Sequence, residues 1–103
     1  MASKYKLLLL PLFEEDLTLI ADYIAIRLQN PAAAERLVSD IESAIYRRLE
    51  APLSTAPYPS KRERLHPYYR INVRNFSVFY VVVDDTMEVR RVLYSRRNLD
   101  DFL

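Results

Sequence analysis

The chain has 103 residues, of which 50% are hydrophobic and 28% are charged. This composition predicts a single globular domain over residues 1–103 and excludes a disordered chain. Cysteine and glycine are both absent, and His66 is the single histidine. We therefore expect no disulfide framework, no resident metal and no cofactor, because zinc sites need several cysteine or histidine ligands and nucleotide-binding loops need glycine.

The net charge is only +1, but the charges are unevenly distributed along the chain. Residues 1–60 carry six basic and eight acidic side chains, whereas residues 61–103 carry nine basic and six acidic ones. The basic half is therefore where an anionic partner is expected to bind. No apolar run approaches the roughly 20 residues of a membrane span, so we expect a soluble, cytoplasmic protein with no membrane partner.

Hydrophobic spacing predicts a strand and then two helices in the first half of the chain. Residues 6–10 form a short apolar run that suits a strand and ends at Pro11. A stripe with helical spacing follows at Leu17, Ile20, Ala21, Ile24 and Leu28. A second stripe comprises Ala34, Leu37, Val38, Ile41, Ala44, Ile45 and Leu49. Asn30 is the expected cap of the second helix and Pro31 its first residue, and so short a link predicts an antiparallel hairpin.

The second half of the chain takes on the two-residue period of strands after a proline-rich loop at residues 51–60. The aromatic side chains of these strands are expected in the core. Turns are predicted at Asn75 and at Asp84-Asp85, between strands that cover residues 68–74, 76–83 and 87–94.

Residues 98–103 are expected to form a short C-terminal helix capped by Asn98, or a tail. The predicted order of elements is β-α-α-β-β-β. This order describes an α+β domain in which the two-helix hairpin packs on an antiparallel sheet.

Three segments of the chain together indicate a family. They are EEDLTLIADYIAIRLQNPAAAERLVSDIESAI for the hairpin, YYRINVRNFSVFYVV for paired strands, and VRRVLYSRRNL for the closing strand with its arginines. In this order they resemble the RelE/ParE superfamily of bacterial toxins from type II toxin-antitoxin modules. The resemblance covers nearly the whole chain and implies growth arrest as the activity and a cognate antitoxin as the partner. RelE-like members cut messenger RNA in the ribosome, whereas ParE-like members poison DNA gyrase.

The resemblance also implies which branch of the superfamily the chain follows. Arg70 falls where RelE-like ribonucleases often have a basic residue, but Ser77 stands where their strand carries a catalytic arginine. The ending resembles the ParE form R-V-L-H-x-x-R-D, with Tyr94, Arg97 and Asn98 at the histidine, arginine and aspartate positions. We therefore favour a ParE-like gyrase inhibitor. The alternatives are a RelE-like ribosome-dependent messenger RNA endonuclease and a degenerate, non-toxic binding module.

Arginine is the residue type expected at the site of either branch, because a guanidinium pairs with two oxygens of one anion and is always charged. The candidates for target binding are Arg70, Arg74, Tyr94, Arg96 and Arg97. A metal-independent endonuclease would use Arg70, Arg74, Arg96 and Arg97 with Tyr80 or Tyr94. A basic loop is a further candidate, at Lys61, Arg62 and Arg64.

Strand alternation predicts which arginines lie together. Arg70 and Arg74 are expected to share one face of their strand. Arg90 and Arg91 are expected to point to opposite faces, so that at most one of them joins a site with Arg70 or Arg74. The other is expected to shield the sheet or to pair with an acidic helix residue.

Overall fold

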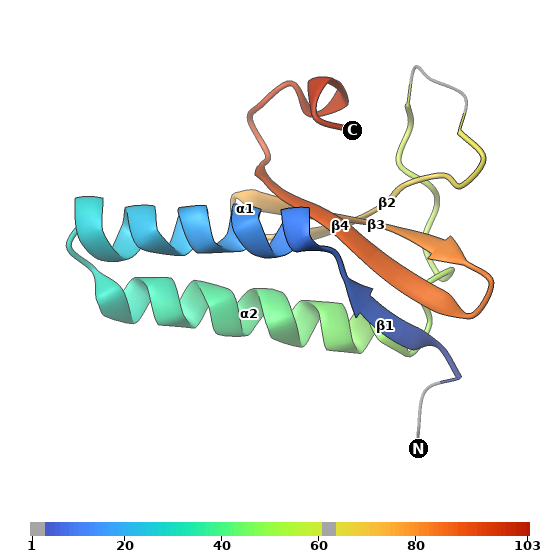
Figure 1. Cartoon of the computed structure of the whole chain (residues 1–103), viewed down its shortest axis with the longest axis horizontal. Coiled ribbons are helices and arrows are strands. Elements are labelled where there is room, and N and C mark those ends of the chain that lie inside the picture. Colours follow the sequence, from blue (N-terminus) through green and yellow to red (C-terminus); the bar gives the residue numbers. More distant parts are fainter. Residues whose placement is uncertain (1–3, 61–63) are drawn as a thin grey trace.

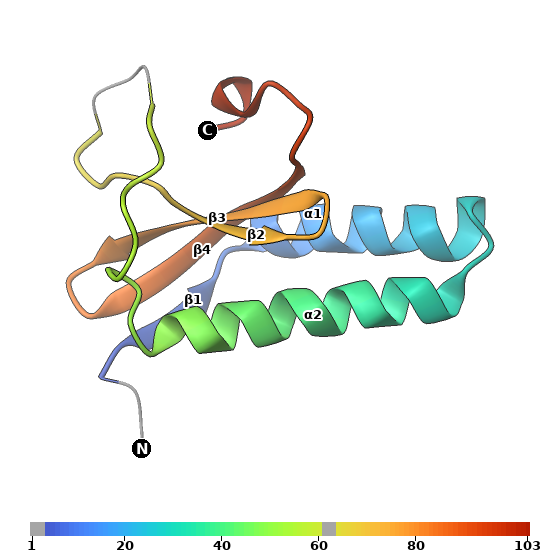
Figure 2. The ribbon, with the colours of Figure 1, turned by 180° about the vertical axis from the view of Figure 1, so that it is seen from behind.

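The structure is a computed structural model that describes residues 4–60 and 64–103. Two helices lie side by side on one face of a four-stranded sheet (Figures 1 and 2). The elements are β1 (Lys6–Leu9), α1 (Pro11–Asp22), the π-helix η1 (Tyr23–Arg27), α2 (Pro31–Leu49), β2 (Tyr69–Val73), β3 (Phe76–Val83), β4 (Thr86–Tyr94) and the 3-10 helix η2 (Leu99–Asp101). The predicted α+β fold and its order of elements are confirmed. In the described parts of the chain, no helix is both long and apolar enough to cross a membrane.

The strands follow the spatial order β1-β4-β3-β2. β2, β3 and β4 form the antiparallel meander expected from the sequence. β1 joins β4 in parallel, with Lys6 opposite Thr86, so the complete sheet is mixed. A parallel neighbour requires a long crossover connection, which the two helices provide. β1 and β2 are the two edges of the sheet.

The outer edge of β2 is partly covered by groups from outside the sheet. The backbone N–H of Tyr58 donates to the carbonyl oxygen of Tyr68 at 2.7 Å. Arg48 Nη1 donates to the carbonyl oxygen of Arg70 at 3.3 Å. Because alternate residues of a strand direct their backbone groups to the same side, Asn72 presents the next pair of groups at this edge.

The hairpin of helices forms as predicted, with one irregular turn. Pro31 is the first residue of α2, and Oδ1 of Asn30 accepts a hydrogen bond from the backbone N–H of Ala33 at 3.1 Å, which confirms the cap. In η1 the backbone N–H of Leu28 donates to the carbonyl of Tyr23, five residues back, at 3.1 Å. This wider turn moves Leu28 out of the apolar stripe and leaves it 56% exposed, so its predicted place in that stripe is wrong.

Apolar side chains pack on both faces of the sheet. The main core lies between the sheet and the helices and includes Phe13, Leu37, Ile41, Ile45, Tyr69, Ile71, Val78, Tyr80, Met87, Val89 and Val92. A smaller core on the opposite face contains Tyr68, Phe79, Val81, Leu93 and Leu99. Tyr58 of the loop after α2 and Leu103 of the C-terminal tail pack against this second core, and the tail lies on that side of the sheet (Figures 1 and 2). The expected burial of the strand aromatics is confirmed for Tyr68, Tyr69, Phe79 and Tyr80.

The C-terminal segment is a tail with a single helical turn. Asn98 occupies the N-cap position of η2, as predicted, but its side chain makes no capping hydrogen bond. A three-residue 3-10 turn offers few unpaired backbone N–H groups for such a cap. The segment is held instead by the buried side chain of Leu99 and by Arg91, whose Nη1 donates to the carbonyl oxygen of Phe102 at 3.3 Å.

Three of the described residues adopt left-handed backbone conformations in a chain that has no glycine to place there. They are Gln29 (φ 51°), Arg74 (φ 54°) and Asp84 (φ 55°). Asp84 lies in the predicted second turn. Arg74 belongs to the β2–β3 turn together with Asn75, and not to the strand.

Gln29→Gly should raise the free energy of unfolding by about 1 kcal/mol, because the left-handed conformation penalises a side chain with a Cβ and helices commonly end on glycine in this conformation. The gain should appear in urea unfolding followed by circular dichroism. Gln29→Ala is the matched control, since it keeps the Cβ and should give no gain. A glycine variant that is no more stable than the alanine variant would contradict this assignment.

Candidate functional site

Arg70 is held by hydrogen bonds on the sheet face that points away from the helices. Its neighbours in β2 face the main core, so strand alternation turns Arg70 to the other side. Its Nε donates to Oδ1 of Asn72 at 2.8 Å and to Oγ of Ser77 at 2.9 Å. The ring centroid of Tyr58 lies 5.7 Å from its guanidinium carbon. Within residues 4–60 and 64–103, Nη1 and Nη2 of Arg70 have no hydrogen-bond partner, so they are available to a ligand.

Ser77 is the centre of this polar cluster. It is a fully buried residue of β3, opposite Asn72 in β2 and Leu93 in β4. Its hydroxyl accepts the bond from Arg70 and lies 2.7 Å from the hydroxyl of Ser95. Ser77, which the resemblance predicts to replace an arginine of RelE-like ribonucleases, positions Arg70 in this structure.

A β-bulge places Arg90 and Arg91 on the same face of the sheet. Val89 and Arg91 pair with successive residues of β3, so Arg90 is an extra residue in β4. Val89 and Val92 both lie in the main core, and the two arginines between them turn to the opposite face. The prediction that Arg90 and Arg91 point to opposite faces is wrong, because it assumed unbroken alternation.

Both of these arginines are paired with carboxylates. Arg90 Nε donates to Oε1 of Glu88 at 2.9 Å. Arg91 binds Asp16 of α1 through Nε at 2.7 Å and Nη2 at 2.9 Å, which confirms that one of the two pairs with an acidic helix residue. These hydrogen bonds to Asp16 raise the pKa of Arg91. Both side chains are therefore committed within the protein.

Two other predicted site residues are directed away from Arg70. Arg74 lies in the turn after β2, and its guanidinium pairs with Asp40 of α2. The prediction that Arg74 shares a face with Arg70 is wrong, because the chain already turns at residue 74. Tyr80 is fully buried, and its hydroxyl donates to the carbonyl oxygen of Pro52 at 2.6 Å. Burial therefore keeps Tyr80 out of any site with Arg70.

The remaining candidates follow the end of β4 and separate into two places. Tyr94 and Arg97 line a groove of about 610 Å³ beside α1, together with Leu19, Ile20, Tyr23 and Phe76. The guanidinium of Arg97 lies 5.4 Å from the ring centroid of Phe102. Arg96 is exposed and directly follows Ser95, which belongs to the Arg70 cluster. The structure thus separates the groove residues from the Arg70 cluster.

The predicted basic loop is described only in part. Lys61 and Arg62 lie outside the described residues. Arg64 Nε donates to Oγ of Ser60 at 3.4 Å, and its guanidinium lies 4.8 Å from the ring centroid of Tyr68. Arg64 therefore packs against the smaller core.

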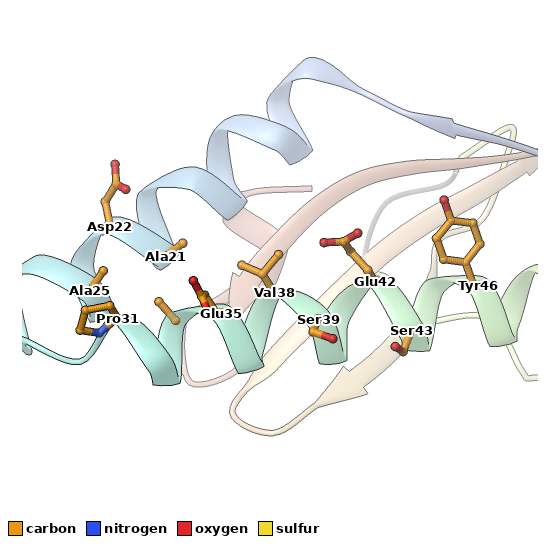
Figure 3. A pocket seen from close by; sticks show the side chains of 11 residues that line it. Ala21, Asp22, Ala25, Pro31, Glu35, Val38, Ser39, Glu42, Ser43 and Tyr46 are labelled. Atoms are coloured by element: carbon orange, nitrogen blue, oxygen red, sulfur yellow. The ribbon is translucent and has the colours of Figure 1, made fainter.

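A groove between the helices carries the opposite charge (Figure 3). It has a volume of about 630 Å³, and its lining includes Asp22, Glu35 and Glu42 among small side chains. None of the predicted site residues that the structure describes lines it. The outer side of the hairpin therefore presents acidic groups, whereas the predicted site residues are mostly arginines.

Sequence reasoning missed the groups that hold Arg70. The available signal was Ser77 itself, a polar residue in an otherwise apolar strand, but strand pairing was needed to bring Asn72 and Ser95 to it. It also missed Arg47 and Arg48, which line a pocket with Arg70 at the end of α2. In the sequence, these two arginines look like ordinary basic residues of the last turn of a helix, where positive charge is common.

Comparison with known proteins identifies the family. Residues 7–99 match the family model described as the ParE toxin of the type II toxin-antitoxin system, parDE. A structure described as the chromosomal ParDE TA system from P. aeruginosa is similar, with a TM-score of 0.71 and 20% identity over 88% of this chain and 96% of that chain. The RelB-RelE antitoxin-toxin complex from Methanococcus jannaschii gives a TM-score of 0.50 and 27% identity over 93% of this chain and 98% of that chain. A search of the curated proteins gave no match. Because the family model spans both helices and the antiparallel strands, the chain belongs to the ParE toxin family of type II toxin-antitoxin systems.

Proposed function

We propose that this ParE-like toxin arrests bacterial growth by binding DNA gyrase. The observation that carries the proposal is the set of groups around Arg70. Its hydrogen-bonded partners are an amide and a hydroxyl, which hold the guanidinium in place but are poor acids and bases near neutral pH. Cutting RNA without a metal requires a base for the 2′-hydroxyl and an acid for the leaving oxygen. The arrangement therefore favours binding a target over cutting RNA.

The proposal includes a cognate antitoxin as the partner that suppresses toxicity. The two similar structures are described as toxin-antitoxin assemblies, which supports such a partner for this chain. An antitoxin segment that covers the sheet and the hairpin would bury the exposed side chain of Arg96 and the groove that holds Tyr94 and Arg97. Carboxylates on that segment would complement these arginines.

Two assays with purified components, run side by side, distinguish DNA gyrase from the ribosome as the target. In a supercoiling assay with DNA gyrase, the purified chain should inhibit the enzyme. In a translation assay with intact messenger RNA, the RNA should stay intact. Cleavage of the messenger RNA, with gyrase supercoiling unaffected, would contradict the gyrase proposal and would indicate the ribosome as the target. Normal growth after induction without antitoxin would instead indicate a non-toxic binding module.

Replacing Arg96 and Arg97 together by alanine should relieve growth arrest. Both side chains are exposed, so the free energy of unfolding should change by less than about 0.5 kcal/mol. Colony counts after induction measure the first effect and urea unfolding the second. Arg36→Ala is the matched control, because Arg36 is an exposed arginine on α2, away from β4. Growth arrest that survives the double change would exclude this pair from the target-binding surface.

A further inference from the structure

A basic pocket lies between the C-terminal end of α2, the loop after it and the outer edge of β2. It has a volume of about 510 Å³, and its polar lining consists of Arg47, Arg48, Arg70, Ser54, Thr55 and Asn72. No carboxylate is among the described residues that line it. The pocket therefore offers several hydrogen-bond donors and positive charge without a negative group of the chain itself.

The arginines of this pocket lack the ion pairs that arginines form elsewhere in the molecule. Within the described ranges, Arg47, Arg48 and Arg70 pair with no carboxylate. Other arginines do pair with carboxylates, namely Arg74, Arg90 and Arg91. The guanidinium of Arg70 lies on the sheet face away from the helices, so the charge of the pocket comes from Arg47 and Arg48 at the end of α2. These two like charges repel each other, and an anion between them adds attractions that outweigh the repulsion. The charge of the pocket thus favours an anionic ligand.

Arg48 is held in position before any ligand binds. Its Nη1 donates to the hydroxyl of Tyr80 at 3.0 Å and to the carbonyl oxygen of Arg70 at 3.3 Å. Tyr80 is itself fixed by burial and by its bond to Pro52. In the described part of the chain, Nε and Nη2 of Arg48 have no hydrogen-bond partner. A ligand would therefore meet a guanidinium that has already lost most of its conformational freedom.

The negative end of the helix dipole does not cancel this charge. The carbonyl oxygens of Arg47 and Arg48 already accept hydrogen bonds from the backbone N–H groups of Glu50 at 3.3 Å and Ala51 at 3.0 Å. Helix-end carbonyls oppose an anion mainly when they are unpaired. Two full guanidinium charges at the same place outweigh a dipole equivalent to about half a charge.

We propose that this pocket binds a phosphate group, with Arg47 and Arg48 as its principal cations. A phosphate has three or more acceptor oxygens, which suits a lining of guanidinium, hydroxyl and amide donors better than a carboxylate with two. The volume exceeds that of one phosphate and leaves room for an attached sugar. The proposal goes beyond the gyrase proposal and does not depend on it.

An NMR titration of the full chain tests the pocket with three probes. They are inorganic phosphate, a nucleoside 5′-monophosphate and a short single-stranded oligonucleotide. Saturable shifts of the backbone signals of Arg47, Arg48 and Ser54 are expected, and the probe with the lowest Kd identifies the source of the phosphate. The nucleoside without phosphate should leave these signals unchanged.

Alanine variants of the two pocket arginines test whether the phosphate probes bind in this pocket. Arg48→Ala should weaken binding of the nucleoside monophosphate about tenfold, because one charge-assisted hydrogen-bond pair is lost. Since Arg48 also contacts Tyr80, Arg47→Ala provides a second variant with an exposed side chain, and a loss of several-fold is expected. Arg36→Ala, on the same helix, should have no effect.

Three results would overturn the proposal. The first is the absence of saturable shifts with all three phosphate probes. The second is unchanged affinity in both Arg47→Ala and Arg48→Ala when the variants remain folded. The third is tighter binding of a glutamate-rich peptide than of every phosphate probe, which would assign the pocket to a protein carboxylate. Growth arrest and gyrase inhibition are measured separately, so failure here leaves the proposed function standing.

Discussion

Asp16→Ala should lower the free energy of unfolding by about 3 kcal/mol, because removing one member of a buried ion pair leaves the other charge without compensation. The side chains of Asp16 and Arg91 are only 11% and 16% exposed. Oδ2 of Asp16 also accepts a hydrogen bond from the backbone N–H of Val92 at 3.2 Å. One carboxylate thus joins α1 to the part of β4 that extends beyond β1. Urea unfolding of the variant and the parent chain measures the loss.

The neighbouring carboxylates provide the controls for Asp16. Glu15→Ala removes an exposed carboxylate one residue away and should change stability by less than about 0.5 kcal/mol. Combining Asp16→Ala with Arg91→Leu should recover much of the loss, because no unpaired charge is then buried. An Asp16→Ala chain as stable as the Glu15→Ala chain would show that the pair does not tie the helix to the sheet.

Tyr80→Phe should lower the free energy of unfolding by about 2 kcal/mol near neutral pH, since it leaves the carbonyl of Pro52 without its hydrogen bond. It also removes the group that accepts a hydrogen bond from Arg48 at 3.0 Å. The ring itself stays in place, stacked on Tyr69 with centroids 5.4 Å apart. Tyr46→Phe is the control, because Tyr46 is an exposed tyrosine of α2.

The effect of Tyr80→Phe should also depend on pH. Burial raises the pKa of the Tyr80 hydroxyl above the value of 10.0 for a free tyrosine, and the bond with Arg48 only partly opposes it. At pH above 10 the unfolded chain therefore ionises this group while the folded chain still holds the proton. The stability that this difference contributes is complete below pH 10 and is lost as the pH rises toward the folded-state pKa. Between pH 8 and pH 11 the parent chain should lose more stability than Tyr80→Phe, and parallel curves would contradict the assignment.

The sequence predicts the elements of this fold better than the placement of its arginines. Helical spacing, the Asn30 cap and the two-residue period depend on local physics, and they hold in the structure except at Leu28 and at the bulge in β4. The bulge at Arg90 depends on how two strands pair, and it places Arg90 and Arg91 on one face instead of on opposite faces. The sequence does not predict that the turn begins at Arg74 either, because an arginine in a left-handed conformation is unusual.

The candidate site shows the same limit. Arg70 was recognisable from its position in the strand, and Ser77 from its contrast with the apolar residues around it. Their contact requires β2 and β3 to pair in one particular register, in which Asn72 lies opposite Ser77. A shift by one residue would turn Arg70 toward the helices. The composition of the cluster is therefore a property of the sheet and not of any single segment.

The cover on the outer edge of β2 bears on how the protein behaves at high concentration. An open strand edge is a template on which the strands of other molecules can add, and this is a common start of aggregation. Two carbonyl groups of this edge, those of Tyr68 and Arg70, are already occupied by Tyr58 and Arg48. A second strand would have to displace both before it could pair along β2. This side of the protein is thereby protected in part against strand pairing with other copies of the chain.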